Sequence, residues 1–407
     1  MSHRGWRAWS SVKRIWTFSV LALLAVIPVV APHIDEDPRQ APSLRAAALE
    51  LEATSTDAVS TAPSATLLTN DPQTAPHAIS DALVSDIEAV PAGESIDVTT
   101  YWISSPRVAS ALAAAFGRGV QVRILIDGGR RSRSSAARSL DDLLNAVATD
   151  SSWLRRTDGA ARGAGGIMHE KTYRFSRVGD VPWVTVTGSW NTAESADLGE
   201  YAAMLRLAGR QDVYELWSDI AEEQRAGRSA GGVAREYAGA DWSAYFLPAA
   251  DSRATDPVLR RLRSIPSRPG TVVRVAMFSM WGDRAGWLSR RLARMSRGGA
   301  DITVVAGPTV SRSARSTLRR GGVRVVAGCF RDGDFVHGKD MSASWVRDGV
   351  RREWTWIGSD NWTSRGMSSD QAVLGIRDAA VYDQFGAAFA RASRRPGGVV
   401  GRACPFG

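Results

Sequence analysis

Two short stretches of this 407-residue chain place a histidine and a lysine two positions apart. His169 and Lys171 lie in "GIMHEKTYRF", and His337 and Lys339 lie in "FVHGKDM". The chain has three lysines and five histidines, so its composition predicts roughly 0.04 such triplets. Two triplets therefore indicate a shared function for these residues.

Histidine and lysine in this arrangement suit the transfer of a phosphoryl group. Residues i and i+2 of a strand point to the same face, so each histidine is expected to project beside its lysine. A neutral imidazole can attack phosphorus near pH 7, and a second, protonated imidazole can give its proton to the leaving oxygen. The ammonium groups can stabilise charge on the non-bridging oxygens.

A second matched element follows each triplet. The stretch "TGSWN" (187–191) contains Ser189 and Asn191, and "IGSDN" (357–361) contains Ser359 and Asn361. Hairpin turns are expected in between, at residues 179–180 and 348–349, so that two adjacent strands present all four residue types on one surface. The alternative, histidines and lysines on unrelated surface strands, is disfavoured because the histidine-to-glycine offsets match, at 19 and 21 residues.

The elements around these residues repeat as well. Residues 94–103 read as a strand, 106–119 as a helix and 120–127 as a strand, and the same order returns at 270–281, 284–299 and 300–307. Strands that alternate with helices predict an α/β fold. The expected architecture is two similar lobes, each a mixed β-sheet flanked by helices.

The expected domain organisation follows from composition. Residues 1–31 hold a basic segment and the apolar run 15–31, which predicts a signal peptide or an uncleaved N-terminal anchor, and hence export. Residues 32–64 read as a flexible stalk, 65–225 as the first lobe, 226–241 as a glycine-rich linker, and 242–407 as the second lobe with a C-terminal tail. The predicted location is secreted or associated with the cell envelope.

The order of these motifs resembles the phospholipase D superfamily, whose motif runs His-x-Lys, four residues, Asp, then Gly-Ser-x-Asn. The resemblance covers about residues 65–395. It implies a duplicated fold whose motifs meet at one site, a covalent phosphohistidine intermediate, and neither metal nor cofactor. By position, His169 matches the histidine that attacks phosphorus, and His337 the one that protonates the leaving group.

One departure from that family pattern concerns the aspartate. Ser176 and Ser344 occupy the two motif Asp positions, and Asp180 and Asp348 follow four residues later, in the expected turns. The mechanism above does not require the aspartate, so activity is still expected. The departure indicates a divergent, exported branch.

Each histidine also needs an acceptor that holds its second ring nitrogen. Glu200 and Asp370 follow their histidines by 31 and 33 residues, each just before an apolar run. They match the acidic residue that orients histidine in the resembling family. The alternative is a solvated acid at the beginning of a strand.

The two cysteines, Cys329 and Cys404, suit an exported protein. One disulfide between them is expected, with two buried free thiols as the alternative. A zinc site is not expected, because no further ligands stand at metal spacing.

Three functions remain open at this point. The first is an exported phospholipase D-like phosphodiesterase that acts on phospholipid head groups, the second an exported, metal-independent nuclease, and the third a catalytically silent protein that binds phosphodiesters or lipids. A net charge of +9 suits an anionic partner, a phospholipid surface or a nucleic acid, although solubility alone would also account for it. No obligate protein partner is evident, and a monomer is expected.

Overall fold

The computed structural model describes residues 64–146 and 150–399, which belong to one compact unit. The predicted signal peptide or anchor, the stalk up to residue 63, and Cys404 lie outside the described residues. Cys329 is buried, and its pairing with Cys404 stays a prediction. Among the described helices, none is long and apolar enough to cross a membrane.

The first lobe contains a mixed sheet with the strand order β1-β7-β6-β5-β2-β3-β4. Strands β2, β3 and β4 are parallel, whereas β5 runs antiparallel to β2. Its elements are β1 (Ser64–Asn70), α1 (Ala78–Glu88), β2 (Ser95–Thr100), α2 (Pro106–Gly117), β3 (Gln121–Asp127), the 3-10 helix η1 (Arg130–Arg133), α3 (Ser135–Asn145), β4 (Trp153–Thr157), β5 (Lys171–Val178), β6 (Val181–Gly188), α4 (Glu194–Gly199), β7 (Glu200–Ala208) and α5 (Gln211–Arg225).

The second lobe repeats this plan with the strand order β12-β11-β10-β14-β15-β17-β9-β8. Its elements are β8 (Arg235–Ala238), β9 (Trp242–Leu247), α6 (Pro257–Ser264), β10 (Val272–Trp281), α7 (Gly282–Arg297), β11 (Asp301–Val310), α8 (Arg312–Arg320), β12 (Arg324–Ala327), β13 (Phe335–Val336), β14 (Lys339–Arg347), β15 (Val350–Gly358), β16 (Trp362–Thr363), α9 (Ser364–Ser368), β17 (Gln371–Ile376) and α10 (Ala379–Arg394). Strand β8 falls within residues 226–241, which the sequence predicted as a plain linker.

The predicted α/β duplication is confirmed by this order. Strands β3-β2-β5-β6-β7-β1 of the first sheet correspond to β11-β10-β14-β15-β17-β9 of the second. Both predicted hairpins are present, with Val178 paired to Val181 and Arg347 to Val350. Local sequence explains the helix positions as well: α2 begins where the Ser105 hydroxyl accepts a hydrogen bond from the Val108 N–H, and Pro106 occupies its first turn.

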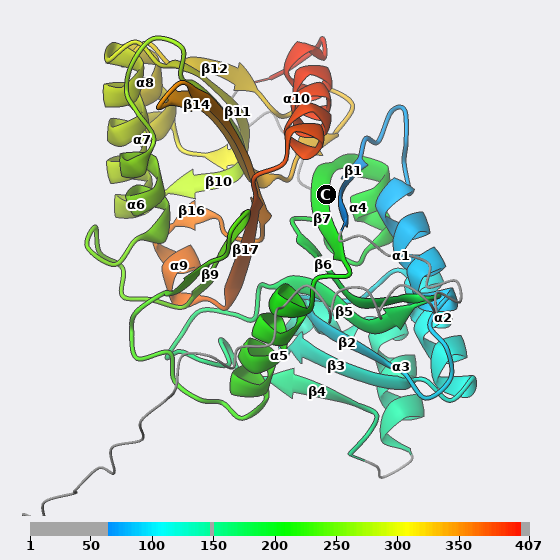
Figure 1. Ribbon diagram of the computed structural model, residues 1–407. Helices are drawn as coiled ribbons and strands as arrows, with labels where there is room; N and C mark the ends of the chain where they lie inside the picture. Colours follow the sequence, from blue (N-terminus) through cyan, green and yellow to red (C-terminus); the bar gives the residue numbers. More distant parts are fainter. Residues whose placement is uncertain (1–63, 147–149, 400–407) are drawn as a thin grey trace, which may run out of the picture. The chain divides into compact units, whose positions relative to one another are not determined.

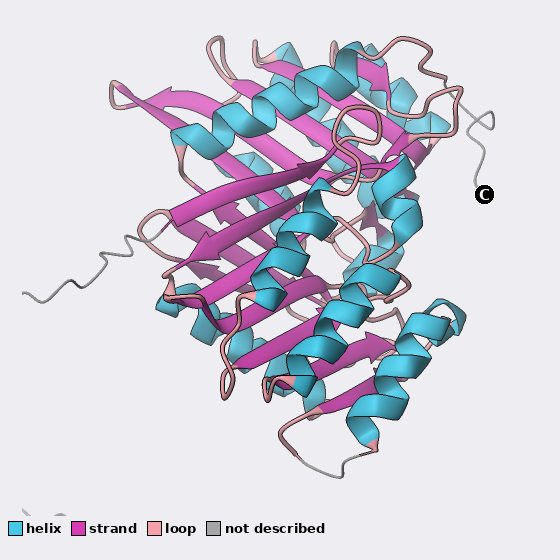
Figure 2. Ribbon diagram, turned by 90° about the vertical axis from the view of Figure 1, so that its right-hand side faces the viewer, coloured by secondary structure: helices cyan, strands magenta, loops and turns pink. Residues whose placement is uncertain are grey.

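The helices form layers on both sheets (Figure 1). Helices α1, α2 and α3 pack with the apolar face of the first sheet, and Figure 2 shows them in front of its strands. Helices α6, α7 and α8 pack on the outer face of the second sheet, while α5 and α10 lie on the sides where the lobes approach each other. A third apolar core joins the lobes and includes Leu205, Phe246 and Phe385. We call this shared core the seam between the lobes. Burial of its apolar side chains holds the two motif regions against each other.

Candidate active site

Backbone hydrogen bonds tie each motif histidine to the opposite lobe. The His169 N–H donates to the Asp370 carbonyl of the second lobe at 3.0 Å, and the His337 N–H donates to the Tyr201 carbonyl of the first lobe at 2.9 Å. Strand β13, which immediately precedes His337, pairs in parallel with β7 of the first lobe. The two contacts are equivalent, so the copies of the motif meet at one place.

The side-chain partners of the histidines also cross between lobes. His169 Nδ1 lies 2.9 Å from Gln371 Oε1, and His337 Nδ1 lies 2.9 Å from Glu200 Oε2. The expectation that Glu200 and Asp370 each hold the histidine of their own lobe is therefore corrected. Glu200 contacts the histidine of the other lobe, and Gln371 takes the place expected for Asp370. The reason is that residues beside each histidine pair with a strand of the opposite lobe, β13 with β7 and Met168 with Asp370.

Asp370 has a different partner. Its Oδ1 accepts a hydrogen bond from Arg162 Nε at 3.1 Å, and its Oδ2 accepts from the N–H groups of Ala161 and Arg162. Both side chains are fully buried. Arg162 belongs to the glycine-rich segment 158–168 between β4 and His169. The buried pair therefore fixes this segment, and with it His169, against the second lobe.

The two lysines lie under the histidines, at the first position of β5 and of β14. Lys171 Nζ donates to the His169 carbonyl, and Lys339 Nζ to the His337 carbonyl, both at 2.6 Å. Lys339 Nζ also lies 2.7 Å from His337 Nε2. Because an ammonium can only donate, that contact leaves Nδ1 of His337 as the N–H, which donates to the Ser189 carbonyl at 3.0 Å and also faces Glu200.

An aromatic ring flanks each histidine, from within β10 in the second lobe and directly after β2 in the first. The ring centroid of Tyr101 lies 5.1 Å from that of His169, and the ring centroid of Phe278 lies 4.6 Å from that of His337. The two positions are equivalent, since Thr100 pairs with Lys171 and Met277 pairs with Lys339. The sequence did not predict this pair of aromatic residues. In each lobe, the aromatic residue comes directly after the residue that pairs with the motif lysine.

Burial sets the charges of the site. It lowers the pKa of His169 well below the ordinary value, together with the charges of Lys171 and Lys339. Burial also lowers the pKa of His337 to about 4 against the opposing effect of Glu200, and that of Lys339 to about 7. For Glu200, burial favours the neutral acid, but the charges of His337 and the two lysines prevail and lower its pKa. Burial and the charge of Lys339 also lower the pKa of Lys171 well below its ordinary value. The site therefore favours neutral imidazoles beside the Glu200 carboxylate, and both lysines release a proton more readily than a lysine in water.

The serines and asparagines of the GSxN elements have separate roles. The Ser189 hydroxyl accepts from the Ala203 N–H at 2.9 Å, and the Ser359 hydroxyl accepts from the Ala372 N–H at 3.1 Å, so both connect neighbouring strands. The amide oxygens of Asn191 and Asn361 are buried without a hydrogen-bond partner in the described part of the chain. Such an oxygen can accept from an incoming N–H or O–H group, and the NH₂ group of the same amide can donate to an incoming anion.

Ser176 and Ser344, at the motif Asp positions, lie away from this chemistry. Each stands five residues beyond its lysine, about 17 Å along the strand at the usual rise per residue. Ser176 donates to Glu94 at 2.6 Å, and Ser344 accepts from the Tyr382 hydroxyl at 3.0 Å. The two serines connect strands to flanking segments, so the departure from the family pattern does not change the groups around the histidines.

Asp340 is a buried acid that sequence reasoning missed. It follows Lys339 directly, and its Oδ2 accepts a hydrogen bond from the Ser189 hydroxyl of the first lobe at 3.4 Å. Its Oδ1 has no hydrogen-bond partner among the described residues, and burial raises its pKa to about 7. Only the contact between lobes distinguishes this carboxyl from an ordinary strand residue.

A cavity of about 110 Å³ opens onto the histidine of the first lobe. His169, Gln371 and Asn361 line it, together with Trp281 and Arg365 among its remaining lining residues. Trp281 is 43% exposed at the end of β10, so an apolar ring stands at the rim.

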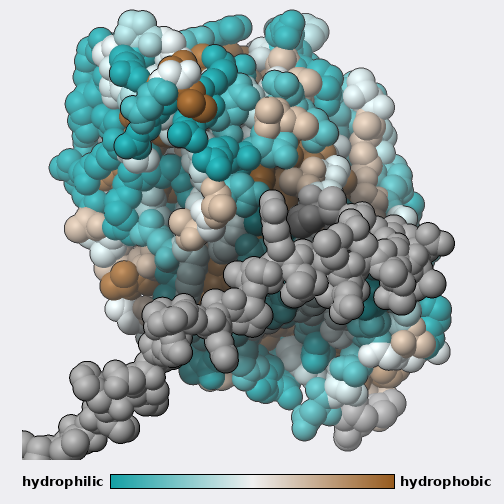
Figure 3. Space-filling view, viewed as in Figure 1, coloured by the Kyte–Doolittle hydropathy of each residue, from teal (hydrophilic) through white to brown (hydrophobic). Residues whose placement is uncertain are grey.

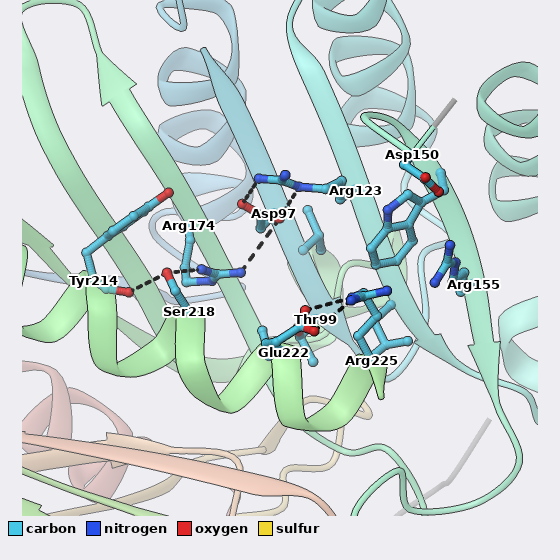
Figure 4. A pocket seen from close by; sticks show the side chains of 14 residues that line it. Asp97, Thr99, Arg123, Asp150, Arg155, Arg174, Tyr214, Ser218, Glu222 and Arg225 are labelled. Carbon is cyan, nitrogen blue, oxygen red and sulfur yellow. Dashed lines mark hydrogen bonds and ion pairs between the residues drawn. The ribbon is translucent and has the colours of Figure 1, made fainter. Parts of the chain in front are cut away.

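A larger cavity, of about 480 Å³, lies elsewhere in the first lobe, between α5 and strands β2 to β4 (Figure 4). Its charges are mostly paired internally: Arg123 and Arg174 face Asp97, and Arg225 faces Glu222. It contains neither motif histidine. In the described ranges, no group of three or more histidine, cysteine, aspartate or glutamate side chains is placed to hold a metal ion.

Comparison with known proteins places this geometry in context. A family model described as "Cardiolipin synthase, PLD-like domain" matches residues 88–223, which lie in the first lobe. A search of curated proteins gave no match.

Among solved structures, phosphatidylserine synthase of Haemophilus influenzae is similar over 81% of this chain and 86% of its own, at 14% identity and a TM-score of 0.57. Polyphosphate kinase of Porphyromonas gingivalis matches 82% of this chain and 51% of its own, at 14% identity and a TM-score of 0.53. Nuc of Salmonella typhimurium, a phospholipase D family member, matches 41% of this chain and 100% of its own, at 22% identity and a TM-score of 0.32. At these identities, the first two establish a shared fold across both lobes.

Proposed function

Because this chain is a member of the phospholipase D superfamily, we propose that it is an exported phosphodiesterase that hydrolyses or transfers phospholipid head groups. The observation that carries the proposal is the crossed pair of histidines. His169 and His337 come from different lobes, meet at one site, and have different Nδ1 partners. Two unlike imidazoles at one phosphorus are what a nucleophile and a general acid require.

The partners assign the two roles. Gln371 offers His169 a neutral amide oxygen, which orients the ring and favours its charged form less than a carboxylate would, so His169 is the nucleophile. Glu200 offers His337 a carboxylate, which stabilises an imidazolium, so His337 carries the proton. Burial lowers the pKa of His337, and the negative charge of a bound phosphodiester raises it again. Lys339, at 2.7 Å from Nε2, can also share its proton with that ring.

The reaction then proceeds in two steps. His169 Nε2 forms a bond to phosphorus as the bond to the leaving oxygen breaks, and that oxygen departs with the proton of His337. Neutral His337 next removes a proton from water or an alcohol, whose oxygen bonds to phosphorus and displaces His169. Lys171, Lys339 and the asparagine amides stabilise the charge on the non-bridging oxygens in both steps.

One prediction and one observation favour a lipid over a nucleic acid substrate. Export, which stays a prediction, would bring the enzyme to envelope lipids, and the exposed Trp281 offers the cavity rim an apolar contact for acyl chains. The alternative is a metal-independent nuclease of the same superfamily, which the same histidines would serve equally well. A binding protein without activity is disfavoured, because both full sets of histidine, lysine and asparagine are present, and five of these six residues are buried, Asn361 being only partly buried.

The test offers the purified protein phosphatidylcholine vesicles and plasmid DNA side by side, with EDTA present throughout. Release of head group without DNA cleavage is the expected result. DNA cleavage with intact lipid would establish the nuclease instead. Loss of all turnover in EDTA, restored by one divalent ion, would contradict the metal-free mechanism, and no turnover on either substrate would leave the binding function.

A further inference from the structure

The two lobes differ strongly in charge. Residues 64–225 contain 16 basic and 21 acidic residues, a net charge of −5, whereas residues 242–399 contain 26 basic and 13 acidic residues, a net charge of +13. The excess is concentrated further, because residues 257–324 contain 15 arginines and only two acids, Asp283 and Asp301. The positive charge of the protein is therefore a property of one region.

That region is the outer helix layer of the second lobe. Helices α6, α7 and α8 pack side by side, and the surface over α7 and α8 is mostly hydrophilic (Figure 3). We define the arginine face as the exposed arginines of these three helices: Arg263, Arg290, Arg294, Arg297, Arg312, Arg319 and Arg320. None of the seven forms an ion pair within the described residues.

The spacing along α7 concentrates this charge in one stripe. Arg290, Arg294 and Arg297 stand at positions i, i+4 and i+7, which share one face of a helix. Like charges at this spacing destabilise a helix. The repulsion reaches neighbouring residues, since the pKa of the half-buried Arg291 is lowered by burial and by the charges of Arg294 and Arg263. The folded molecule thus contains an uncompensated repulsion that an anionic partner would relieve.

We propose that the arginine face docks the protein onto an anionic phospholipid bilayer. The face is broad, because the 16 residues of α7 alone extend about 24 Å and α6 and α8 widen it on either side. Basic residues close to an anionic bilayer attract its head groups cumulatively. Helix α7 also begins directly after the exposed Trp281, which lines the cavity at His169. The arginine face therefore includes α7, and the rim of the active site includes Trp281, the last residue of the strand that leads directly into this helix.

A nucleic acid fits this face less well. Single-stranded nucleic acids bind where aromatic rings alternate with basic residues, so that bases can stack. Among the exposed large hydrophobic residues of the described chain, none lies on α6, α7 or α8. A tryptophan beside a basic surface is instead typical of contact with the interface of a membrane.

The test compares three forms of the full-length chain by co-sedimentation with vesicles. These are the wild type, the triple variant Arg290→Gln/Arg294→Gln/Arg297→Gln, and a matched control, Arg118→Gln/Arg138→Gln/Arg228→Gln. The control removes the same charge from exposed arginines that form no ion pair among the described residues and lie outside the face. Vesicles contain either phosphatidylglycerol mixed with phosphatidylcholine or phosphatidylcholine alone, and any contribution of the N-terminal apolar segment is equal in all three forms.

The expected result is that the triple variant binds the phosphatidylglycerol vesicles on the order of 100-fold more weakly than the wild type, while the control changes little. Binding of the wild type should weaken as salt rises. Equal losses in both variants would show an effect of net charge alone and would overturn the proposal, as would equal binding to both kinds of vesicle. Salt-dependent binding to duplex DNA, lost in the triple variant without vesicle binding, would assign the face to a nucleic acid.

The docking proposal goes beyond the proposed reaction, and its failure can be told apart from failure of that reaction. Vesicle binding requires no turnover. Conversely, hydrolysis of a soluble p-nitrophenyl phosphodiester reports on the histidines alone, and the triple variant should match the wild type in that assay.

Discussion

At the scale of single residues, the site depends on an asymmetry between two otherwise matched halves. Both histidines make equivalent backbone hydrogen bonds to the opposite lobe, yet Gln371 faces His169 and Glu200 faces His337. A carboxylate favours an imidazolium far more than an amide does, so the two rings differ in how readily they hold a proton. The first two predictions test this difference.

Removal of the His169 imidazole and removal of the His337 imidazole should have different consequences. His169→Ala removes the nucleophile and should reduce kcat by about 10³-fold or more with every substrate. His337→Ala should be almost as damaging with a poor leaving group, because that oxygen must be protonated as it departs. With p-nitrophenolate as leaving group, the first step should be partly rescued, and a phosphoenzyme should accumulate.

Trapping of that intermediate decides the assignment. Mass spectrometry should place the phosphoryl group on His169 in the His337→Ala variant. A label on His337 of the wild-type protein would reverse the roles, and the absence of any label would indicate direct attack by water.

Exchange of the Nδ1 partners should shift the pH dependence. Gln371→Glu places a carboxylate beside His169 and raises its pKa, so the neutral nucleophile forms only at higher pH and the acid limb of kcat should move up by about one to two units. Glu200→Gln should instead lower activity by about 10²-fold or more with poor leaving groups and much less with p-nitrophenolate. The exposed Glu194→Gln serves as control; an acid limb that stays in place in Gln371→Glu would refute the assignment.

At the scale of elements, the segment 158–168 determines where His169 lies. Arg162 and Asp370 fix it from one side, and glycines allow it to pass close to the second lobe. A Cβ at Gly166 would lie 2.2 Å from the Ser368 carbonyl oxygen, whereas one at Gly165 would meet nothing within 4 Å. Both glycines have positive φ, +74° and +84°, so they differ mainly in that contact.

These two glycines provide a matched pair of variants. Gly165→Ala should cost only the strain of its backbone conformation, about 1–2 kcal/mol of unfolding free energy, with kcat nearly unchanged. Gly166→Ala adds a clash with backbone and should displace the segment, lowering kcat by about 10²-fold, since catalysis is sensitive to displacements of about 1 Å. Thermal unfolding and p-nitrophenyl phosphodiester hydrolysis measure both effects. Equal kcat values for the two variants would show that the segment does not position His169.

At the scale of the whole molecule, the seam between lobes contains a buried carboxyl. Asp340 of the second lobe contacts Ser189 of the first and lines a small cavity between β7, β10 and α10. Burial raises its pKa to about 7, above the ordinary value of 3.8, so the folded state favours the protonated form. The stability that this group contributes is complete at low pH and is lost as the pH rises through about 7.

Asp340→Asn should therefore flatten the pH dependence of stability. Between pH 4 and 7.5, the wild type should lose about 1–3 kcal/mol more unfolding free energy than the variant, because the amide stays neutral throughout. Chemical denaturation at each pH measures this difference, and Asp180→Asn, an exposed turn residue, should follow the wild type. A steeper pH dependence in Asp340→Asn would mean that the carboxyl is ionised in the folded protein.

The sequence by itself determined the fold class, the duplication and the residue types of the site. Hydrophobic periodicity and turn residues act over a few neighbouring positions, so they predicted β2, α2, β3 and their repeats, and also both hairpins. The repeated triplets and GSxN elements identified His169, Lys171, His337 and Lys339 because their spacing is local as well. The structure brings all four together.

Only the tertiary structure decided which side chain contacts each motif histidine. Order along the chain assigned Glu200 and Asp370 to the histidines of their own lobes, but the seam pairs each histidine with the opposite lobe, and Gln371 replaces Asp370. Asp340 likewise has no local signal, and the arginine excess of residues 257–324 can be read from the sequence, but not that three helices gather it on one face. Their properties arise from burial against a distant strand and from three helices packed side by side, and such contacts depend on packing between segments that are remote in the sequence.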